Sequence, residues 1–271
     1  MAFVRSGEAD IWYEVYGEGP PLVLVHGAGG NTLVWWQQIP AFARGHTVVV
    51  MDHRCFGRSR CPKAAFLPER FPQDLVAVLD DTGIERAALV GMSMGGWTVL
   101  PTAVRHPDRV SRLVLCGTPG GLVTDAVLEA MADVARGAAE QPADSLRGAI
   151  TFSERFVQER PEMVHLYDQI SALNTGFEPA MLAAVGAPAA RLTPSELADY
   201  AVPTLMIAAE HDRLFPPPVL RGVAALIPGC ELVDFPGAGH SMYFEDPERF
   251  ERIVLGWLEA DPSGTARDTG R

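Results

Sequence analysis

The stretch Gly91-Met92-Ser93-Met94-Gly95 joins an apolar run to an amphipathic segment, and this junction decides the fold. Residues 87–90 read Ala-Ala-Leu-Val and predict a buried strand, whereas residues 95–105 predict a helix that stops at His106-Pro107. A strand that turns sharply into a helix strains the central residue of the turn, so the residues around it must be small. Gly91 and Gly95 meet that need. The turn would therefore lift the Ser93 hydroxyl above a sheet, at the N-terminus of a helix that favours negative charge.

Further short runs of Val, Ile and Leu repeat this strand pattern along the chain, and each ends in a small or polar residue. The expected strands cover residues 9–16, 22–25, 47–51, 87–90, 113–116, 203–209 and 230–235. Helices are expected at residues 72–81 and 247–259, where apolar residues follow a helical period. Uninterrupted apolar strands that alternate with helices predict an α/β fold, with a mostly parallel sheet covered on both faces.

The composition changes between the strands at residues 113–116 and 203–209. Residues 118–199 are rich in Ala, Met, Leu and Glu and carry few strand signals. This predicts a mainly helical insertion, a cap, in a core domain formed by residues 1–117 and 200–260. Residues 261–271 are rich in Gly, Ser and charged residues, which predicts a flexible tail.

Composition and charge exclude several kinds of partner. The chain has 271 residues and a formal net charge of −12, which disfavours nucleic acid and anionic membranes. No stretch approaches the about 18 apolar residues that span a bilayer, and residues 1–16 do not resemble a signal peptide.

The chain has four cysteines, Cys55, Cys61, Cys116 and Cys230, which form no CxxC pair and no metal-ligand spacing. We therefore expect free thiols, a cytoplasmic protein and no metal site.

A serine hydroxyl is a poor nucleophile and needs a general base that is held by an acid. His240 is the best candidate for the base, because it ends the loop of residues 236–240 just after the last expected strand. Asp212 is the best candidate for the acid, since it follows the strand that ends near residue 209. Glu210 is a rival acid, and His211 is expected to serve structure. All these loops lie at the carboxyl ends of strands, where open α/β sheets bind ligands.

The negative charge that develops on a carbonyl oxygen needs backbone N–H donors. One donor is expected from Met94, the residue after the serine. The second is expected from the glycine-rich stretch at residues 26–30, with Ala28 as first choice and Gly27 as the alternative. Glycine-rich loops also bind phosphates, but neither G-x-G-x-x-G nor a P-loop is present.

Apolar and aromatic residues flank these loops and are candidates for a substrate pocket. For each aromatic residue, packing in the core is the competing interpretation. The pocket candidates are Gly27, Trp35, Trp36, Phe56, Trp97, Met242 and Tyr243. The charged run at residues 245–248 is interpreted as the N-terminus of the last helix.

With these residues in place, the chain resembles the α/β-hydrolase superfamily up to about residue 260. The resemblance rests on the stretches at residues 26–29, 52–59, 91–96, 210–212 and 237–240, which occur in the family's order. In the second stretch Cys55 replaces the usual glycine, while His53 and Arg54 usually serve structure there. The resemblance implies an eight-stranded sheet and a helical cap after the sixth strand. It also implies cleavage of an ester, lactone or thioester through an acyl-enzyme, without metal or cofactor.

Within that superfamily, small carboxylesterases and 3-oxoadipate enol-lactonases are the most similar, and cofactor-free haloperoxidases share the triad. A serine nucleophile disfavours epoxide hydrolases and haloalkane dehalogenases. Carbon–carbon hydrolases of ring-fission products usually have Asn before the nucleophile and Trp after the histidine, where this chain has Met92 and Ser241. That alternative stays open, as does a ligand-binding protein on the same fold. The expected partner is a small ester or lactone, and self-association into a homo-oligomer stays open.

Overall fold

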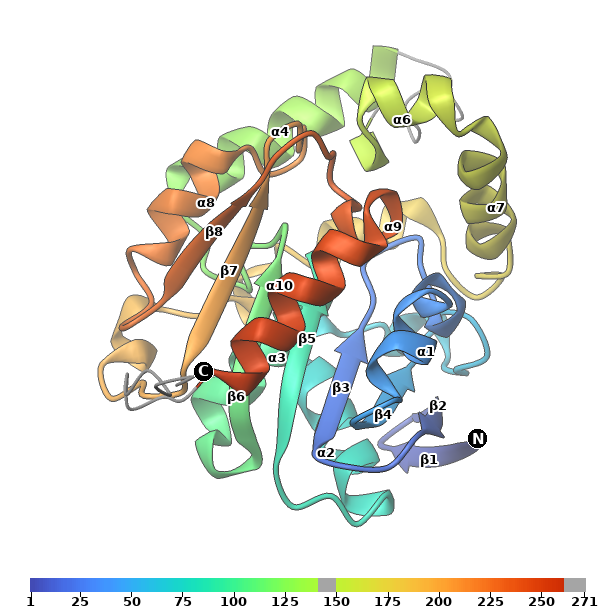
Figure 1. Ribbon diagram of the computed structural model, residues 1–271, viewed down its shortest axis with the longest axis vertical. Helices are drawn as coiled ribbons and strands as arrows, with labels where there is room; N and C mark the ends of the chain where they lie inside the picture. Colours follow the sequence, from blue (N-terminus) through green and yellow to red (C-terminus); the bar gives the residue numbers. More distant parts are fainter. Residues whose placement is uncertain (141–149, 261–271) are drawn as a thin grey trace, which may run out of the picture.

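The computed structural model describes residues 1–140 and 150–260. An eight-stranded sheet with the order β1-β2-β4-β3-β5-β6-β7-β8 forms its centre (Figure 1). The strands are β1 (Ala2–Ser6), β2 (Ala9–Tyr16), β3 (Pro21–Val25), β4 (Thr47–Met51), β5 (Ala87–Met92), β6 (Val110–Cys116), β7 (Thr204–Ala209) and β8 (Glu231–Phe235). β2 pairs antiparallel with β1 and β4, and all other pairs are parallel. The predicted α/β-hydrolase fold with an eight-stranded, mostly parallel sheet is therefore confirmed.

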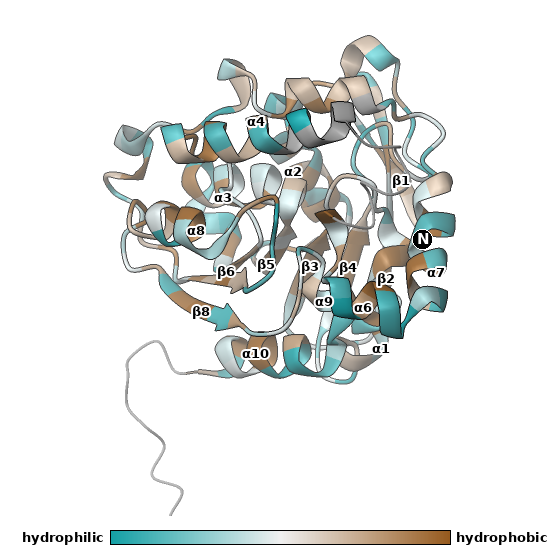
Figure 2. Ribbon diagram, turned by 90° about the horizontal axis from the view of Figure 1, so that it is seen from above, coloured by the Kyte–Doolittle hydropathy of each residue, from teal (hydrophilic) through white to brown (hydrophobic). Residues whose placement is uncertain are grey.

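Helices cover both faces of the sheet because alternate residues of each strand point to opposite faces. Val23 and Val25 of β3 belong to an apolar core to which α2 (Phe71–Asp81), α3 (Gly96–Arg105) and α8 (Pro217–Ala224) also contribute. Leu22 and Leu24 pack on the other face with α1 (Gln38–Phe42) and α10 (Pro247–Glu259). Figure 2 shows the sheet between these two helical layers. Two apolar cores thus fix the strand ends that carry the loops.

The chain between β6 and β7 forms helices over one end of the sheet. α4 (Asp125–Glu140), α6 (Glu154–Glu159) and α7 (Pro161–Ala172) arch over the upper end in Figure 1. In the described part of this segment, the only β pairing is an isolated bridge between Leu122 and Leu192. We call residues 118–199 the cap segment. The predicted helical character is observed there, while its status as a separate domain stays a prediction.

Shorter elements complete the chain. Further helices in the described part of the chain are α9 (Met242–Glu245) and the 3-10 helices η1 (Thr32–Trp35), η2 (Lys63–Ala65), η3 (Pro68–Arg70), η4 (Ser93–Gly95), η5 (Pro107–Arg109), η6 (Pro179–Ala184), η7 (Pro188–Ala190) and η8 (Pro194–Leu197). Across residues 1–140 and 150–260, no helix is both long and apolar enough to cross a membrane. The predicted tail at residues 261–271 lies outside the described residues.

The prediction of free thiols at all four cysteines is wrong for two of them. Cys55 and Cys61 form a disulfide, with their Cα atoms 5.4 Å apart, whereas Cys116 and Cys230 are free. The turn after β4 brings the pair together, although their sequence separation of 6 matches no familiar motif. Because disulfides persist mainly in oxidising compartments, the cysteines no longer support the expectation of a cytoplasmic protein.

Candidate active site

Ser93 stands at the turn between β5 and α3 with a strained backbone. Its φ of +51° lies in the left-handed region, which a residue other than glycine rarely adopts. Ser93 is the first residue of η4, so the N–H groups of this turn are not used by a preceding helical turn. Its side chain is nearly buried, with an exposed fraction of 8%. The strained turn that the sequence predicts is therefore observed, with the hydroxyl at the start of a helix.

Close backbone packing forces this turn to contain glycines. A Cβ atom at Gly95 would lie 2.3 Å from the carbonyl oxygen of Val25 at the end of β3. A Cβ atom at Gly91 would lie 2.4 Å from Cγ2 of Val99 in α3 and 2.9 Å from the Gly95 oxygen. Real Cβ atoms do not approach other atoms this closely. The turn is thus pressed between a strand and its own helix, which leaves Ser93 little freedom.

Asp212 and His240 are joined at the carboxyl ends of β7 and β8. His240 Nδ1 lies 2.8 Å from Asp212 Oδ2, and the two residues are 7% and 3% exposed. The other carboxylate oxygen, Oδ1, accepts hydrogen bonds from the backbone N–H groups of Leu214 and Phe215, at 2.8 and 2.9 Å. Asp212 is therefore fixed by its own loop. With Nδ1–H donating to Asp212, the tautomer leaves Nε2 as the basic nitrogen of the ring.

The rival acid, Glu210, points elsewhere. Its side chain is exposed and accepts a hydrogen bond at 2.8 Å from the backbone N–H of Gly237. The neighbouring His211 is also exposed, and its backbone N–H donates to the carbonyl oxygen of Ala238. Glu210 and His211 thus tie the loop after β7 to the loop after β8. The geometry favours Asp212 as the partner of His240.

Residues 26–30, which we call the oxyanion loop after the role expected for it, lie directly against Ser93. A Cβ atom at Gly27 would lie 2.9 Å from Cβ of Ser93 and 3.6 Å from its Oγ. Gly30 N–H donates to Gly27 O at 3.1 Å, which closes the loop into a tight turn. Among the described residues, no backbone carbonyl oxygen accepts a hydrogen bond from the N–H of Ala28. The backbone of the loop therefore does not occupy this donor.

Two buried histidines hold the start of this loop. The backbone N–H of His53 donates to Nε2 of His26 at 3.0 Å, and Nδ1 of His26 lies 2.7 Å from the Gly27 oxygen. The two rings meet edge to face, with their centroids 4.7 Å apart. Burial lowers the pKa of His26 to about 4 and also lowers the pKa of His53. A neutral His26 ring is required here because its Nε2 accepts a hydrogen bond.

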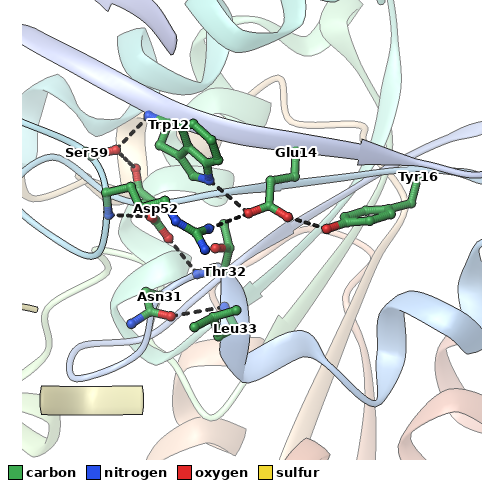
Figure 3. A network of polar contacts seen from close by, with 9 residues as sticks. Trp12, Glu14, Tyr16, Asn31, Thr32, Leu33, Asp52 and Ser59 are labelled. Carbon is green, nitrogen blue, oxygen red and sulfur yellow. Dashed lines mark hydrogen bonds and ion pairs between the residues drawn. The ribbon is translucent and has the colours of Figure 1, made fainter. Parts of the chain in front are cut away.

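Asp52 connects the far end of the loop to the turn after β4 (Figure 3). Its Oδ1 accepts from the backbone N–H of Thr32 at 2.6 Å, and its Oδ2 accepts from that of Arg58 at 2.8 Å. The hydroxyl of Ser59 donates to the Asp52 carbonyl oxygen at 2.7 Å. A Cβ at Gly57, where φ is +51°, would lie 2.3 Å from Oδ2. The stretch at residues 52–59 is therefore a scaffold for the oxyanion loop.

The predicted pocket residues are mostly core residues. Trp35, Met242 and Tyr243 are at most 1% exposed, and Trp35 lies 4.5 Å from the Tyr243 ring. Phe56 and Trp97 are likewise buried, against Phe177 and Phe215 respectively, whereas Trp36 is 45% exposed. Of the candidates, only Gly27 is placed against Ser93 by a close contact. A pocket role for the others stays a prediction.

Two residues beside the site were not identified from the sequence. A Cβ atom at Gly117, just after β6, would lie 3.1 Å from Asp212 Oδ2 and 3.2 Å from His240 Nδ1. Glu245, read as part of a charged helix start, accepts at 2.8 Å from the N–H groups of both Gly239 and Ser153. The helix instead begins with Asp246, which caps it. A glycine that ends a strand was a usable signal for Gly117, but nothing local marks Glu245.

Comparison with known proteins assigns the chain to a family. The profile of the alpha/beta hydrolase fold family matches residues 20–247. The chain belongs to the α/β-hydrolase family. Among curated relatives, 2-hydroxymuconate semialdehyde hydrolase of Pseudomonas sp. strain CF600 is 33% identical over 90% of this chain and 89% of its own length.

Solved structures extend the comparison. Est816, described as an N-acyl homoserine lactone degrading enzyme, superposes with a TM-score of 0.81 at 29% identity, covering 94% of this chain and 99% of its own. A thermophilic esterase from Thermogutta terrifontis gives a TM-score of 0.79 at 26% identity, covering 95% and 97%. The chain is thus similar over nearly its whole length to hydrolases with different substrates.

Proposed function

We propose that this α/β-hydrolase cleaves a small-molecule carboxylic ester or lactone, with Ser93 as nucleophile and an acyl-enzyme as intermediate. The observation that carries the proposal is the 2.8 Å contact between His240 Nδ1 and Asp212 Oδ2. This contact lies at the same edge of the sheet as Ser93 on its strained turn. A nucleophile, a base and an orienting acid on separate strand ends are the parts that acyl transfer needs.

In the proposed mechanism, Ser93 Oγ attacks the carbonyl carbon while His240 Nε2 accepts the hydroxyl proton. Asp212 orients the ring and stabilises the imidazolium. The backbone N–H groups of Met94 and Ala28 stabilise the oxyanion. His240 then donates its proton to the departing alkoxide, which leaves Ser93 acylated. Water attacks the acyl group after losing a proton to His240, and collapse of the second tetrahedral intermediate releases the acid and restores Ser93.

The relatives support the substrate class without identifying the substrate. Est816 is described as degrading a lactone, and the Thermogutta protein is described as an esterase. Both match nearly the whole chain, so the cap segment is included in the similarity. We therefore place an ester or lactone carbonyl above Ser93.

The test is replacement of Ser93 by alanine. Turnover of a p-nitrophenyl ester should fall by on the order of 10³ or more, because the nucleophile is removed. Ser195, an exposed serine in η8, provides the matched control as Ser195→Ala, which should keep full turnover. A fluorophosphonate should label the unaltered protein at Ser93, with loss of fluoride, and mass spectrometry reads the adduct. An unlabelled Ser93, or most of the activity kept in Ser93→Ala, would overturn the proposal.

A second candidate is hydrolysis of a carbon–carbon bond in a ring-fission product. It is favoured by the 33% identity to 2-hydroxymuconate semialdehyde hydrolase. The positions that carry Asn and Trp in that class hold Met92, which packs in the core, and Ser241, whose N–H donates to Thr151 O at 2.8 Å. Bleaching of a chromophoric ring-fission dienoate would identify this activity. Turnover of the dienoate well above that of esters and lactones would replace the first candidate.

A further inference from the structure

One amide of the cap segment reaches across to both loops that flank Ser93. Asn174 follows α7 and is 8% exposed. Its Nδ2 donates to the carbonyl oxygens of Gly29 at 3.0 Å and Gly30 at 3.1 Å. Its Oδ1 accepts from the backbone N–H of Gly57 at 2.8 Å and from Nδ2 of Asn31 at 3.2 Å. A primary amide has two N–H donors and two lone pairs, so this side chain is fully hydrogen-bonded.

These partners fix the orientation of the amide and define what it connects. Carbonyl oxygens can only accept and a backbone N–H can only donate, so Asn174 fits in one way round. Its nitrogen holds the oxyanion loop, and its oxygen holds the turn that Asp52 supports from the core. Asn31 forms a second connection to the cap segment, because its Nδ2 also donates to the Ile170 carbonyl oxygen of α7 at 2.9 Å.

The carbonyl groups that Asn174 holds lie just after the expected oxyanion donor. Gly29 has a φ of +84°, a conformation open mainly to glycine. The core fixes the loop on either side, through His26 before it and through Asp52 and Thr32 after it. Between these two anchors, the side chain of Asn174 binds the carbonyl groups of Gly29 and Gly30.

We propose that Asn174 is a positioning residue of the hydrolytic site. By holding the Gly29 and Gly30 carbonyl groups, it restricts the peptide planes that follow Ala28 and so aims the Ala28 N–H at the oxyanion. The inference rests on the proposed function. In this proposal, the contact of the cap segment with the oxyanion loop contributes to transition-state stabilisation, in addition to any effect of the cap segment on which substrate binds.

The test replaces Asn174 by aspartate, which keeps the oxygen for Gly57 and Asn31 but places an acceptor against the two carbonyl groups. Turnover of a p-nitrophenyl ester should lose about 10- to 100-fold in kcat, with KM within about threefold, because misplacing an oxyanion donor acts on the transition state. Thr175→Ala, an exposed neighbour, is the control that should keep kcat and KM. Rates are normalised to the fraction that fluorophosphonate labels, which counts only folded sites.

A second readout reports the loop itself. Amide hydrogen exchange of a peptide covering residues 26–31 should become faster in Asn174→Asp and stay unchanged in Thr175→Ala. Unchanged exchange there, or a kcat within about twofold of the unaltered protein, overturns the proposal. A loss of activity that disappears after normalisation to folded sites also overturns it, since the role would then be structural only.

Asn31→Ser serves if Asn174→Asp does not fold. Serine keeps an oxygen that can cap Leu33 but removes the donor to Asn174 and Ile170. We expect a kcat about 3- to 10-fold lower with KM unchanged, and an unaltered kcat counts against the proposal. Ser93→Ala separates the two proposals. If that variant stays active, both fail; if it is inactive while Asn174→Asp keeps its kcat, only the role of Asn174 fails.

Discussion

The nucleophile turn and the oxyanion loop meet at Ser93, yet they are held in opposite ways. The turn at residues 91–95 is shaped by backbone contacts too close for any side chain, between β3, β5 and α3. The loop at residues 26–30 is held by hydrogen bonds from side chains, His26 and Asp52 in the core and Asn174 in the cap segment. Packing fixes the first region, whereas a polar network fixes the second.

This difference separates what is constant in the fold from what is adjustable. A turn pressed between strand and helix has no room for a side chain at Gly91 or Gly95, because interiors are close-packed. A hydrogen-bonded loop can shift by small amounts when a partner is changed or protonated, because each bond contributes modestly. Changes at these two glycines should therefore act on folding, and changes around the loop should act mainly on rate and on pH dependence.

The largest effect is expected for Gly95→Ala. Its Cβ would lie 2.3 Å from the Val25 carbonyl oxygen, and neither this strand nor the helix can move away without disturbing the sheet. The free energy of unfolding in urea should fall by about 3 kcal/mol or more. Gly222→Ala is the matched control, since a Cβ there meets nothing within 4 Å and the residue lies in α8. The free energy of unfolding of Gly222→Ala should rise by about 0.5–1 kcal/mol. Equal stabilities of the two variants would contradict the packing argument.

The same contrast explains how far the sequence could predict the molecule. Buried parallel strands have continuous apolar runs, so β3, β4, β5 and β7 were predicted close to their observed bounds. The edge strand β1 was missed because its five residues alternate between half-buried and exposed positions. The helices α1 and α8 were missed because they are short and contain prolines.

The site divides along the same line. Ser93, Asp212 and His240 follow strands directly, so their shared location at one edge follows from topology alone. Asn174 and Glu245 form hydrogen bonds across elements, and nothing in the local sequence says which loop a cap amide or a half-buried carboxylate will meet. The Cys55–Cys61 pair was misjudged for the same reason, since only the folded turn brings the two together.

The next effect is the pH dependence of the oxyanion loop. Burial lowers the pKa of His26 to about 4 from an ordinary value of 6.5. As the pH falls below 6.5, His26 binds a proton in the unfolded chain but stays neutral in the folded protein. The contribution of the neutral His26 to the free energy of unfolding is therefore complete above pH 6.5 and shrinks as the pH falls toward 4. Protonation of His26 in the unfolded chain should lower the free energy of unfolding by on the order of 2 kcal/mol between pH 7 and pH 5.

A non-titrating variant isolates this contribution. His26→Gln removes the proton site and keeps a polar group toward His53, so its stability should fall less steeply between pH 7 and pH 5 than that of the unaltered protein. Urea titrations at both pH values measure the difference. Ring-proton NMR provides the direct check: a His26 resonance that titrates near pH 6.5 would show that the ring is not held neutral. The nucleophile turn contains no titratable residue between Gly91 and Gly95 and should not contribute.

The smallest effect compares the two residues other than glycine that have positive φ in the described chain, Ser93 in the nucleophile turn and Cys55 in the turn that supports the oxyanion loop. Ser93 has a φ of +51°, and its hydroxyl is the expected nucleophile. Cys55 has a φ of +67° and occupies a position where the family usually has glycine. Both Cys55→Gly and Cys55→Ala lose the disulfide, but only glycine relieves the left-handed backbone. Cys55→Gly should therefore be more stable in urea by about 1 kcal/mol. Cys61→Ala, which loses the disulfide but keeps the side chain at position 55, should match Cys55→Ala. If Cys55→Gly is no more stable than these two variants, the backbone at position 55 is not strained, and positive φ at a residue other than glycine does not by itself lower stability here.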